Sequence, residues 1–276
     1  MTTEPSPTIP ETKADGPSLA VDPRAAIDAI PRAYNFAEDI LECNLKAGHA
    51  NKPVYVDPRG AWTYGQLAER VGRFGCVLRS LGIRREERVL LALLDTIDWP
   101  TAFLGAIKAG IVPIPVNTLM TEDDYWFVLT DSRAKALIVS EALYPKFANL
   151  IGSAPELMHV IVSGENTGGC RRLEDALADA RPESYTAPTT RDDICFWLYT
   201  SGSTGRPKAA VHVHASLRLT ADLYAGGVLG LKESDVCYSV AKLFFAYGLG
   251  NALTFSMAAE CGRREYPWTV PNRTRA

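Results

Sequence analysis

The sequence predicts an α/β fold with mostly parallel sheets and flanking helices. Short, continuously apolar runs such as 88–95 and 194–199 alternate along the chain with amphipathic helical patterns such as 61–83. Strands that helices cover on both faces are apolar throughout, and strands separated by helices usually lie parallel. The chain has 276 residues, of which 47% are hydrophobic, so it can bury a substantial core.

The clearest predicted helix is AWTYGQLAERVGRFGCVLRSLGI, residues 61–83. Thr63 and Gln66 fit a capping box at its start, and Gly82 is expected to end it. Its apolar side chains recur at steps of three and four, so they share one face. These side chains are Leu67, Val71, Phe74, Leu78 and Leu81.

Helical and strand patterns continue to alternate after this helix. A strand is expected at 88–95 and a helix at 101–109, which ends at Gly110, and the proline-limited segment 111–117 is expected to be extended. Further helical patterns lie at 122–132, 173–180 and 249–259, and further strand patterns at 135–140, 159–164, 194–199 and 235–241.

The two ends of the chain differ in composition from the middle. Residues 1–22 are rich in Pro, Thr and acids and have no apolar core, which predicts a disordered lead-in and excludes a secretory signal. Residues 23–260 are predicted to form one truncated domain. Residues 261–276 have no periodicity, and an exposed tail is one interpretation. We favour another: a deletion, a frameshift or a gene-model error interrupts the natural domain here.

Composition excludes several classes of function. The net charge of −3 gives no general attraction to nucleic acid, and no apolar segment is long enough to span a membrane. The six cysteines form no CxxC pair, so free thiols in a reducing cytoplasm are expected. His212 and His214 would face the same side of a strand, but no third metal ligand is evident, so no metal site is predicted.

The stretch LYTSGSTGRPKAAVHVH, residues 198–214, has the composition of a phosphate-binding loop. It is not the common P-loop, because Gly205 follows Gly202 by only three residues and a strand pattern, rather than a helix, comes next. The phosphate donors are therefore expected to be backbone N–H groups, hydroxyls and one ammonium group. They belong to Thr200, Ser201, Gly202, Ser203, Thr204, Gly205 and Lys208.

The segment YTSGSTGRPK, residues 199–208, resembles the signature of the adenylate-forming superfamily of acyl-CoA synthetases, luciferases and peptide-synthetase adenylation domains. Two further segments resemble motifs of this superfamily in the same order. They are WTYGQL at 62–67, with Gln66 in place of Glu, and IKAGIVPIPVN at 107–117. These two read as core and capping elements rather than as catalytic ones.

In this superfamily the segment that follows a late strand lines the carboxylate pocket. KLFFAYGLGN, residues 242–251, is the matching segment, and with 32–41 and 115–125 it resembles benzoate-CoA ligases and their hydroxybenzoate relatives. The expected substrate-binding residues are Phe245, Ala246, Tyr247 and Gly248, which offer an aromatic wall and a space beside the glycine. Phe244 is expected to pack in the core.

The resemblance implies two half-reactions that use ATP, Mg²⁺ and CoA. An aromatic carboxylate is converted to acyl-AMP, and CoA then displaces AMP to give a thioester, with Lys208 as the catalytic cation at the departing pyrophosphate. Later motifs of the superfamily and its C-terminal domain are absent. We therefore expect an incomplete N-terminal domain that is inactive alone. Alternatives are an enzyme that loads a carrier protein and a non-catalytic nucleotide-binding fragment.

Overall fold

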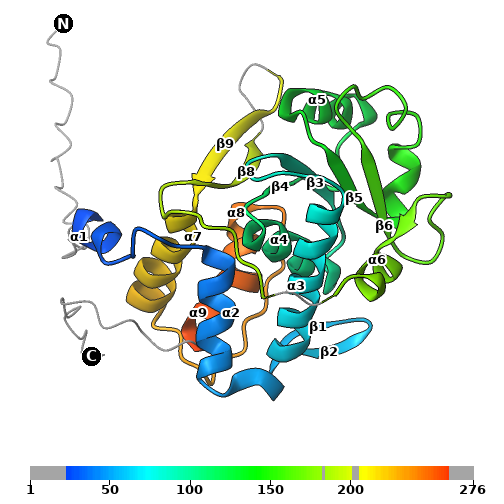
Figure 1. Cartoon of the computed structure of the whole chain (residues 1–276). Coiled ribbons are helices and arrows are strands. Elements are labelled where there is room, and N and C mark those ends of the chain that lie inside the picture. Colours follow the sequence, from blue (N-terminus) through cyan, green and yellow to red (C-terminus); the bar gives the residue numbers. More distant parts are fainter. Residues whose placement is uncertain (1–22, 182–183, 201–204, 261–276) are drawn as a thin grey trace, which may run out of the picture.

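The computed structural model describes residues 23–181, 184–200 and 205–260 (Figure 1). The predicted lead-in, 1–22, and the predicted tail, 261–276, lie outside the described residues, as do Ser201, Gly202, Ser203 and Thr204.

A five-stranded, wholly parallel sheet lies at the centre, in the order β4-β3-β5-β6-β7. Its strands are β3 (Arg88–Ala92), β4 (Val112–Pro115), β5 (Ala136–Ser140), β6 (His159–Ser163) and β7 (Arg171–Arg172). Four of these strands fall within the strand patterns read from the sequence, so the predicted α/β class with a parallel sheet is confirmed.

Helices cover both faces of this sheet. α2 (Phe36–Lys46), α3 (Tyr64–Ser80) and α4 (Asp98–Lys108) pack on one face, and α5 (Glu122–Ser132) packs on the other. Val89 and Leu91 of β3 belong to the core cluster that includes α2, α3 and α4, whereas Leu90 and Ala92 belong to the cluster that includes α5. Because successive side chains of a strand point to opposite faces, a strand buried on both faces must be apolar throughout.

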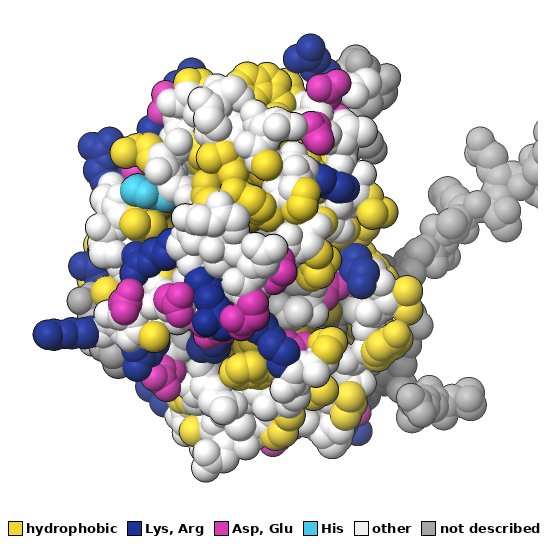
Figure 2. Space-filling model, turned by 90° about the vertical axis from the view of Figure 1, so that its right-hand side faces the viewer, with side chains coloured by type: hydrophobic (Ala, Val, Ile, Leu, Met, Phe, Trp, Pro, Cys, Tyr) yellow, Lys and Arg dark blue, Asp and Glu magenta, His cyan; other side chains and the backbone are white. Residues whose placement is uncertain are grey.

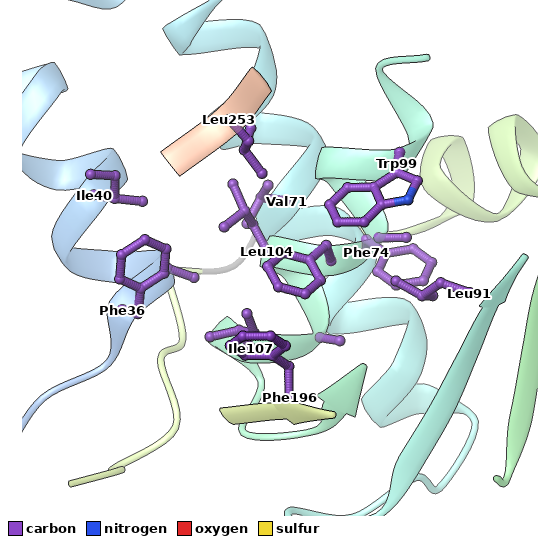
Figure 3. Close-up of a cluster of buried hydrophobic side chains, with 14 of the residues drawn as sticks. Phe36, Ile40, Val71, Phe74, Leu91, Trp99, Leu104, Ile107, Phe196 and Leu253 are labelled. Atoms are coloured by element: carbon purple, nitrogen blue, oxygen red, sulfur yellow. The ribbon is translucent and has the colours of Figure 1, made fainter. Parts of the chain in front are cut away.

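The larger core cluster joins residues that are far apart in the sequence (Figure 3). Side chains from α2, α3 and α4 meet Phe196 of the late strand β8 and Leu253 near the C-terminal end of the described chain. Trp99 and Phe103 stack with ring centroids 4.9 Å apart, and Phe103 meets Phe196 edge-on at 5.5 Å. Residues 23–260 therefore share a core that spans much of their length.

Helix α3 confirms the predicted capping box. The backbone N–H of Gln66 donates to Thr63 Oγ1 at 3.3 Å, and the N–H of Thr63 donates to Gln66 Oε1 at 2.8 Å. Gly82 follows the helix with a φ of 78°, a left-handed conformation that suits glycine. The helix begins at Tyr64, so residues 61–63 belong to a strand instead.

Two antiparallel hairpins flank the parallel sheet. β1 (Pro53–Asp57) pairs with β2 (Gly60–Thr63), and no strand pattern described above predicts either strand. β8 (Ile194–Thr200) pairs with β9 (Lys208–Val213) and lies beside β4 (Figure 1). The prediction that the glycine-rich loop joins two strands is confirmed.

The remaining helices are short or contain π-helical turns. The predicted helix at 173–180 is α6 (Leu173–Asp179). The one predicted at 249–259 is a continuous run of α8 (Ala246–Leu249), the π-helical η4 (Gly250–Thr254) and α9 (Phe255–Glu260). Unpredicted helices are α1 (Pro23–Asp28), η1 (His49–Asn51), η2 (Glu141–Lys146), α7 (His214–Thr220) and the π-helical η3 (Ala221–Leu229).

The predicted strand at 235–241 is wrong for the described chain, where this segment is irregular. No strand among the described residues pairs with it. Its alternating apolar side chains, Val236, Tyr238 and Val240, are 96%, 87% and 82% exposed. A strand pattern needs a neighbouring edge to satisfy its backbone groups, and propensity cannot replace that edge.

His212 and His214 do not face the same side of a strand. His212 lies on β9 and stacks on Phe196 at 4.6 Å, whereas His214 begins α7 and is buried. The backbone N–H of Phe36 donates to His214 Nδ1 at 3.1 Å. Burial lowers the pKa of His214 to about 4, although the nearby charge of Asp193 acts in the opposite direction. His214 is thus a neutral packing residue.

His214 is expected to make stability fall in mild acid. Its ordinary pKa is 6.5, so the unfolded chain takes up a proton between pH 6.5 and about 4 that the folded chain excludes. The contribution is fully present above pH 6.5, and about 2–3 kcal/mol is lost as the pH falls to about 4. Urea unfolding at a series of pH values measures this loss. His214→Asn, which keeps an acceptor for Phe36, should flatten the profile. A steep profile in His214→Asn would contradict the assignment.

Candidate functional site

The candidate phosphate loop connects strands β8 and β9, which pair as an antiparallel hairpin. Thr200 and Lys208 form the last pair in the β8–β9 register, and Thr200 Oγ1 donates to the Lys208 carbonyl oxygen at 3.4 Å. Gly205 has a φ of 89°, with open space where a Cβ would lie. Because β9 follows the loop directly, no helix N-terminus contributes to anion binding here. The loop must rely on its own N–H groups, hydroxyls and lysine.

The described part of the loop is open to solvent. Gly205 and Lys208 are exposed, and Lys208 forms no ion pair with the side chains that the structure describes. The four residues between Thr200 and Gly205 are the ones predicted to supply most of the donors, and they lie outside the described residues. A role for Lys208 at a bound phosphate stays a prediction.

Helix α5 holds both ends of the loop. On the β8 side, the Tyr199 hydroxyl donates to Asp131 Oδ2 at 2.6 Å. On the β9 side, the Arg206 guanidinium lies over the Phe127 ring, 5.3 Å from its centroid. Burial raises the pKa of Tyr199, and the hydrogen bond to Asp131 raises it further, so the phenol stays a donor. Sequence reasoning missed these contacts, because no local pattern relates Asp131 to a tyrosine that lies 68 residues away.

Removing the Tyr199 hydroxyl should loosen this anchor. Tyr199→Phe is expected to lower the free energy of unfolding by about 1 kcal/mol, because one charge-assisted hydrogen bond is lost while Asp131 stays solvated. Urea denaturation measures the change. Tyr238→Phe is the matched control, since Tyr238 is 87% exposed, and it should have no effect. Equal stabilities of the two variants would contradict the anchor.

The candidate acid-binding segment lies at the carboxyl end of a parallel strand. The backbone N–H of Leu243 donates to Asp95 Oδ1 at 3.3 Å, and Lys242 Nζ lies 3.6 Å from Asp95 Oδ2. Asp95 follows β3 by three residues, and α/β sheets bind ligands beyond the carboxyl ends of their strands. The segment therefore occupies a part of the fold where binding is expected.

Within this segment the aromatic side chains divide into a buried and an exposed set. Phe244 is 7% exposed, as expected for a core residue, whereas Phe245 is 49% and Tyr247 68% exposed. Ala246 is exposed as well. The Phe244 and Phe245 rings are tilted against each other at 4.5 Å. The exposed Phe245 ring thus packs against the buried Phe244 ring.

Gly248 is required by a close approach of backbone. A Cβ at this position would lie 2.0 Å from the carbonyl oxygen of Lys242 and 2.6 Å from that of Ala241. The space beside Gly248 is therefore occupied by the chain itself. A role for this glycine in leaving room for an acid stays a prediction.

Within the described residues, no hydrogen bond, ion pair or ring contact joins the loop to the acid-binding segment. Strand β8, which leads into the loop, and the acid-binding segment contact opposite ends of β3. Trp197 of β8 lies 5.8 Å below the guanidinium of Arg88, the first residue of β3, whereas the acid-binding segment contacts Asp95 beyond its last. The described chain thus holds two separate groups of candidate residues.

A buried ion network lies near the start of α4. Asp98 is 1% exposed and accepts hydrogen bonds from Arg70 Nη2 and Ser163 Oγ, each at 2.6 Å. Arg59 Nη2 lies 3.0 Å from Asp98, and Arg70 also binds Glu174 through two nitrogens at 2.8 and 3.0 Å. Burial opposes ionisation of Glu174, but the hydrogen bond to Arg70 and the charges of Arg70, Arg59 and Arg172 together outweigh burial and lower the pKa of Glu174.

This network does not offer a second binding site. A hollow of about 460 Å³ beside it is lined by Trp62, Arg70 and Glu174 among others. The charged groups of Arg70 and Glu174 already satisfy one another, and Figure 2 shows positive and negative side chains intermixed across the middle of this face. The network joins the β1–β2 hairpin, α3, α4 and α6, which is a structural role.

Three further expectations concern metals, membranes and thiols. Among the described residues, no group of three or more His, Cys, Asp or Glu side chains could hold a metal ion. No helix in the same part of the chain is long and apolar enough to cross a membrane. Cys76, Cys170, Cys195 and Cys237 are free thiols as expected, whereas Cys43 is disulfide-bonded, which corrects the prediction for that residue.

The chain is similar to known proteins over most of its length. The sequence pattern of the family described as "AMP-binding enzyme" matches residues 44–262. A benzoate–CoA ligase of Thauera aromatica is 52% identical over 230 residues, which cover 83% of this chain and 43% of that protein. A 4-hydroxybenzoate–CoA/benzoate–CoA ligase of Rhodopseudomonas palustris is 40% identical over 236 residues.

Solved structures agree with these sequence relatives. A benzoate CoA ligase from Burkholderia xenovorans LB400 matches with a TM-score of 0.76 and 45% identity, over 82% of this chain and 44% of that one. The anthranilate CoA ligase AuaEII in complex with anthranoyl-AMP matches with a TM-score of 0.82 and 37% identity, over 85% and 45%. The chain thus spans less than half the length of the relatives that it matches.

Proposed function

The chain belongs to the AMP-binding enzyme family, and on that premise we propose that it forms the ATP-binding part of a ligase for aromatic carboxylic acids. The observation that carries the proposal is the β8–β9 hairpin, whose glycine- and hydroxyl-rich connection ends at Lys208. The relatives named above are CoA ligases of benzoate, hydroxybenzoate and anthranilate, which supports an aromatic acid as the substrate class.

The proposed reaction has two steps. The carboxylate attacks the α-phosphorus of ATP, so that acyl-AMP forms and pyrophosphate leaves. The thiol of CoA then attacks the acyl carbon, and AMP leaves as the thioester forms. No protein nucleophile is needed, because positioning and charge neutralisation carry this type of transfer.

Each group of candidate residues has a proposed part in the first step. The loop from Thr200 to Gly205 holds the phosphates through its N–H groups and hydroxyls. Lys208 offsets the negative charge that grows on the departing pyrophosphate. Phe245, Ala246, Tyr247 and Gly248 form the wall against which an aromatic ring rests by offset or edge contacts.

We propose that Mg²⁺ enters with ATP, because Mg²⁺ usually keeps several waters and is bound through one or two carboxylates together with substrate phosphates. In the part of the chain that the structure covers, no group of three or more His, Cys, Asp or Glu side chains could hold a metal ion by itself. We therefore assign no step to protein ligands of Mg²⁺. A cytoplasmic location likewise stays a prediction.

ATP binding by the purified chain tests the proposed phosphate site. Calorimetry with MgATP should show binding that weakens about 10-fold or more in Lys208→Ala, because one charge-assisted contact to phosphate is lost. Lys46→Ala is the matched control, since the Lys46 side chain is 76% exposed on α2 and pairs with Glu42 on the same helix. Binding that is unchanged in Lys208→Ala, or absent in the wild type, would contradict the proposal.

We further propose that this chain alone does not complete the reaction. Its match spans 43–45% of the length of these relatives, so more than half of each relative has no counterpart in the matched residues. Incubation with benzoate, ATP and CoA should therefore yield no benzoyl-CoA above the uncatalysed level. Turnover at ordinary enzyme rates would refute this. Transfer of the acyl group to the thiol of a carrier protein, rather than to CoA, would favour the alternative function of an enzyme that loads a carrier protein.

A further inference from the structure

Helix α5 contacts both flanks of the candidate phosphate loop from a single face. Phe127 and Asp131 are four residues apart on this helix, so their side chains lie one above the other. Asp131 accepts a hydrogen bond from the Tyr199 hydroxyl at 2.6 Å, and the Phe127 ring centroid lies 5.3 Å from Arg206 Cζ. One helix face therefore holds the chain where it enters the loop and where it leaves it.

The strand register places the candidate phosphate-binding side chains on the other face of the hairpin. Tyr199 pairs with Ala209, and the next pair along the register is Thr200 with Lys208. Successive side chains of a strand point to opposite faces, and directly paired residues share a face. Thr200 and Lys208 therefore project away from the face that Tyr199 turns to α5. Their exposure agrees with this, since both are exposed whereas Tyr199 is half-buried.

We propose that Phe127 and Asp131 are positioning residues of the phosphate loop, which hold its flanks so that Lys208 meets the phosphates of ATP in a fixed direction. The inference rests on the proposed function, because it takes ATP as the ligand beside Lys208. A binding segment that is held in place before the ligand arrives loses less conformational entropy on binding, so its affinity is higher.

The glycine at the second flank makes such support valuable. Gly205 has a φ of 89°, and no atom lies within 4 Å of the place where its Cβ would be. Glycine loses more conformational freedom on ordering than any other residue. Because Arg206 follows Gly205 directly, its contact with Phe127 restricts the backbone at this flank.

The contact at the first flank is charge-assisted. Burial raises the pKa of Tyr199, and the hydrogen bond to Asp131 raises it further, so the phenol remains protonated and donates to the carboxylate. Packing without positioning is the alternative role for these contacts. In that case their loss would lower the stability of the fold and leave the affinity for ATP unchanged.

Calorimetry with MgATP, at a temperature where every variant is folded, separates positioning from packing. Asp131→Ala should weaken binding about 5-fold and Phe127→Leu about 3-fold, because each removes one contact to a flank. Asp131→Asn keeps an acceptor for the Tyr199 hydroxyl and should stay within about 2-fold of the wild type. Asp123→Ala is the matched control, since Asp123 is an exposed acid in the first turn of the same helix, and it should leave the Kd unchanged.

A double-mutant cycle tests the hydrogen bond itself. Tyr199→Phe and Asp131→Ala should weaken MgATP binding by similar factors, and the double variant should bind no more weakly than either, because both remove the same contact. Losses that multiply would mean that the two residues act independently. That result, or an unchanged Kd in Asp131→Ala, overturns the proposal.

Amide hydrogen exchange gives a readout that does not need ATP. The amides of Gly205 and Arg206 should exchange about 10-fold faster in Asp131→Ala and Phe127→Leu than in the wild type, and Asp123→Ala should leave them unchanged. Unaltered exchange would overturn the positioning role whether or not ATP binds. A wild-type chain that binds no MgATP would instead refute the proposed function, and a Kd that responds to Lys208→Ala but not to Asp131→Ala would refute the positioning role alone.

Discussion

Asp98→Ala is expected to lower the free energy of unfolding by about 3–5 kcal/mol, because Arg70, Arg59 and Ser163 lose the buried carboxylate that they share. Asp98 is 1% exposed and accepts hydrogen bonds from Arg70 and Ser163 at 2.6 Å, and Arg59 lies 3.0 Å away. One carboxylate therefore satisfies groups from α3, β6 and the β1–β2 hairpin region. Urea unfolding monitored by circular dichroism measures the loss.

Asp179→Ala provides the matched control for this prediction. The Asp179 side chain is 72% exposed and pairs with Arg171 at 3.1 Å on the surface. Such pairs contribute about 0–1 kcal/mol, so the variant should remain close to the wild type. If Asp98→Ala costs less than about 1 kcal/mol, the network is not the anchor that its geometry indicates.

Gly248→Ala is expected to cost about 3 kcal/mol, because the added Cβ would lie 2.0 Å from the Lys242 carbonyl oxygen. The neighbouring atoms are backbone, and they cannot move away as a flexible side chain would. The substitution should therefore displace the segment that carries Phe245 and Tyr247. Denaturant unfolding measures the cost, and an altered near-ultraviolet dichroism signal would report the aromatic displacement.

Gly227→Ala is the control for the glycine prediction. A Cβ there would lie 3.6 Å from the Asp222 carbonyl oxygen, which is ordinary van der Waals contact. The variant should be neutral or slightly more stable, because alanine loses less backbone entropy in a helical turn. Equal effects of the two alanines would mean that the close approach at Gly248 carries no cost.

The setting of the candidate phosphate loop was readable from sequence because it depends on neighbouring residues. The glycines, hydroxyls and lysine of 199–208 are neighbours in the chain. The strand patterns on either side predicted that the loop joins two strands, as it does. The anchors of that loop were not readable. Tyr199 meets Asp131 and Arg206 meets Phe127 only because α5 packs beside the hairpin, and no sequence period encodes that contact.

The predicted strand at 235–241 is wrong, although the pattern that predicted it is local. Its alternation is a valid strand signal, yet the segment is irregular because a strand also requires an edge to pair with. The prediction that His214 lies on a strand beside His212 is wrong for a related reason. His214 continues the alternation of β9, but helix α7 begins at this residue and buries it against the backbone of Phe36.

By itself, the sequence determined the α/β class, the parallel strands, the α3 capping box and the strand–loop–strand setting of the phosphate residues. These features depend on patterns within about twenty neighbouring residues, where periodicity and turn chemistry act directly. Only the tertiary structure decided the Asp98 network, the protonation of His214, the close approach at Gly248 and the exposure of Val236, Tyr238 and Val240. The reason is physical, since burial and pairing depend on segments that only folding brings together.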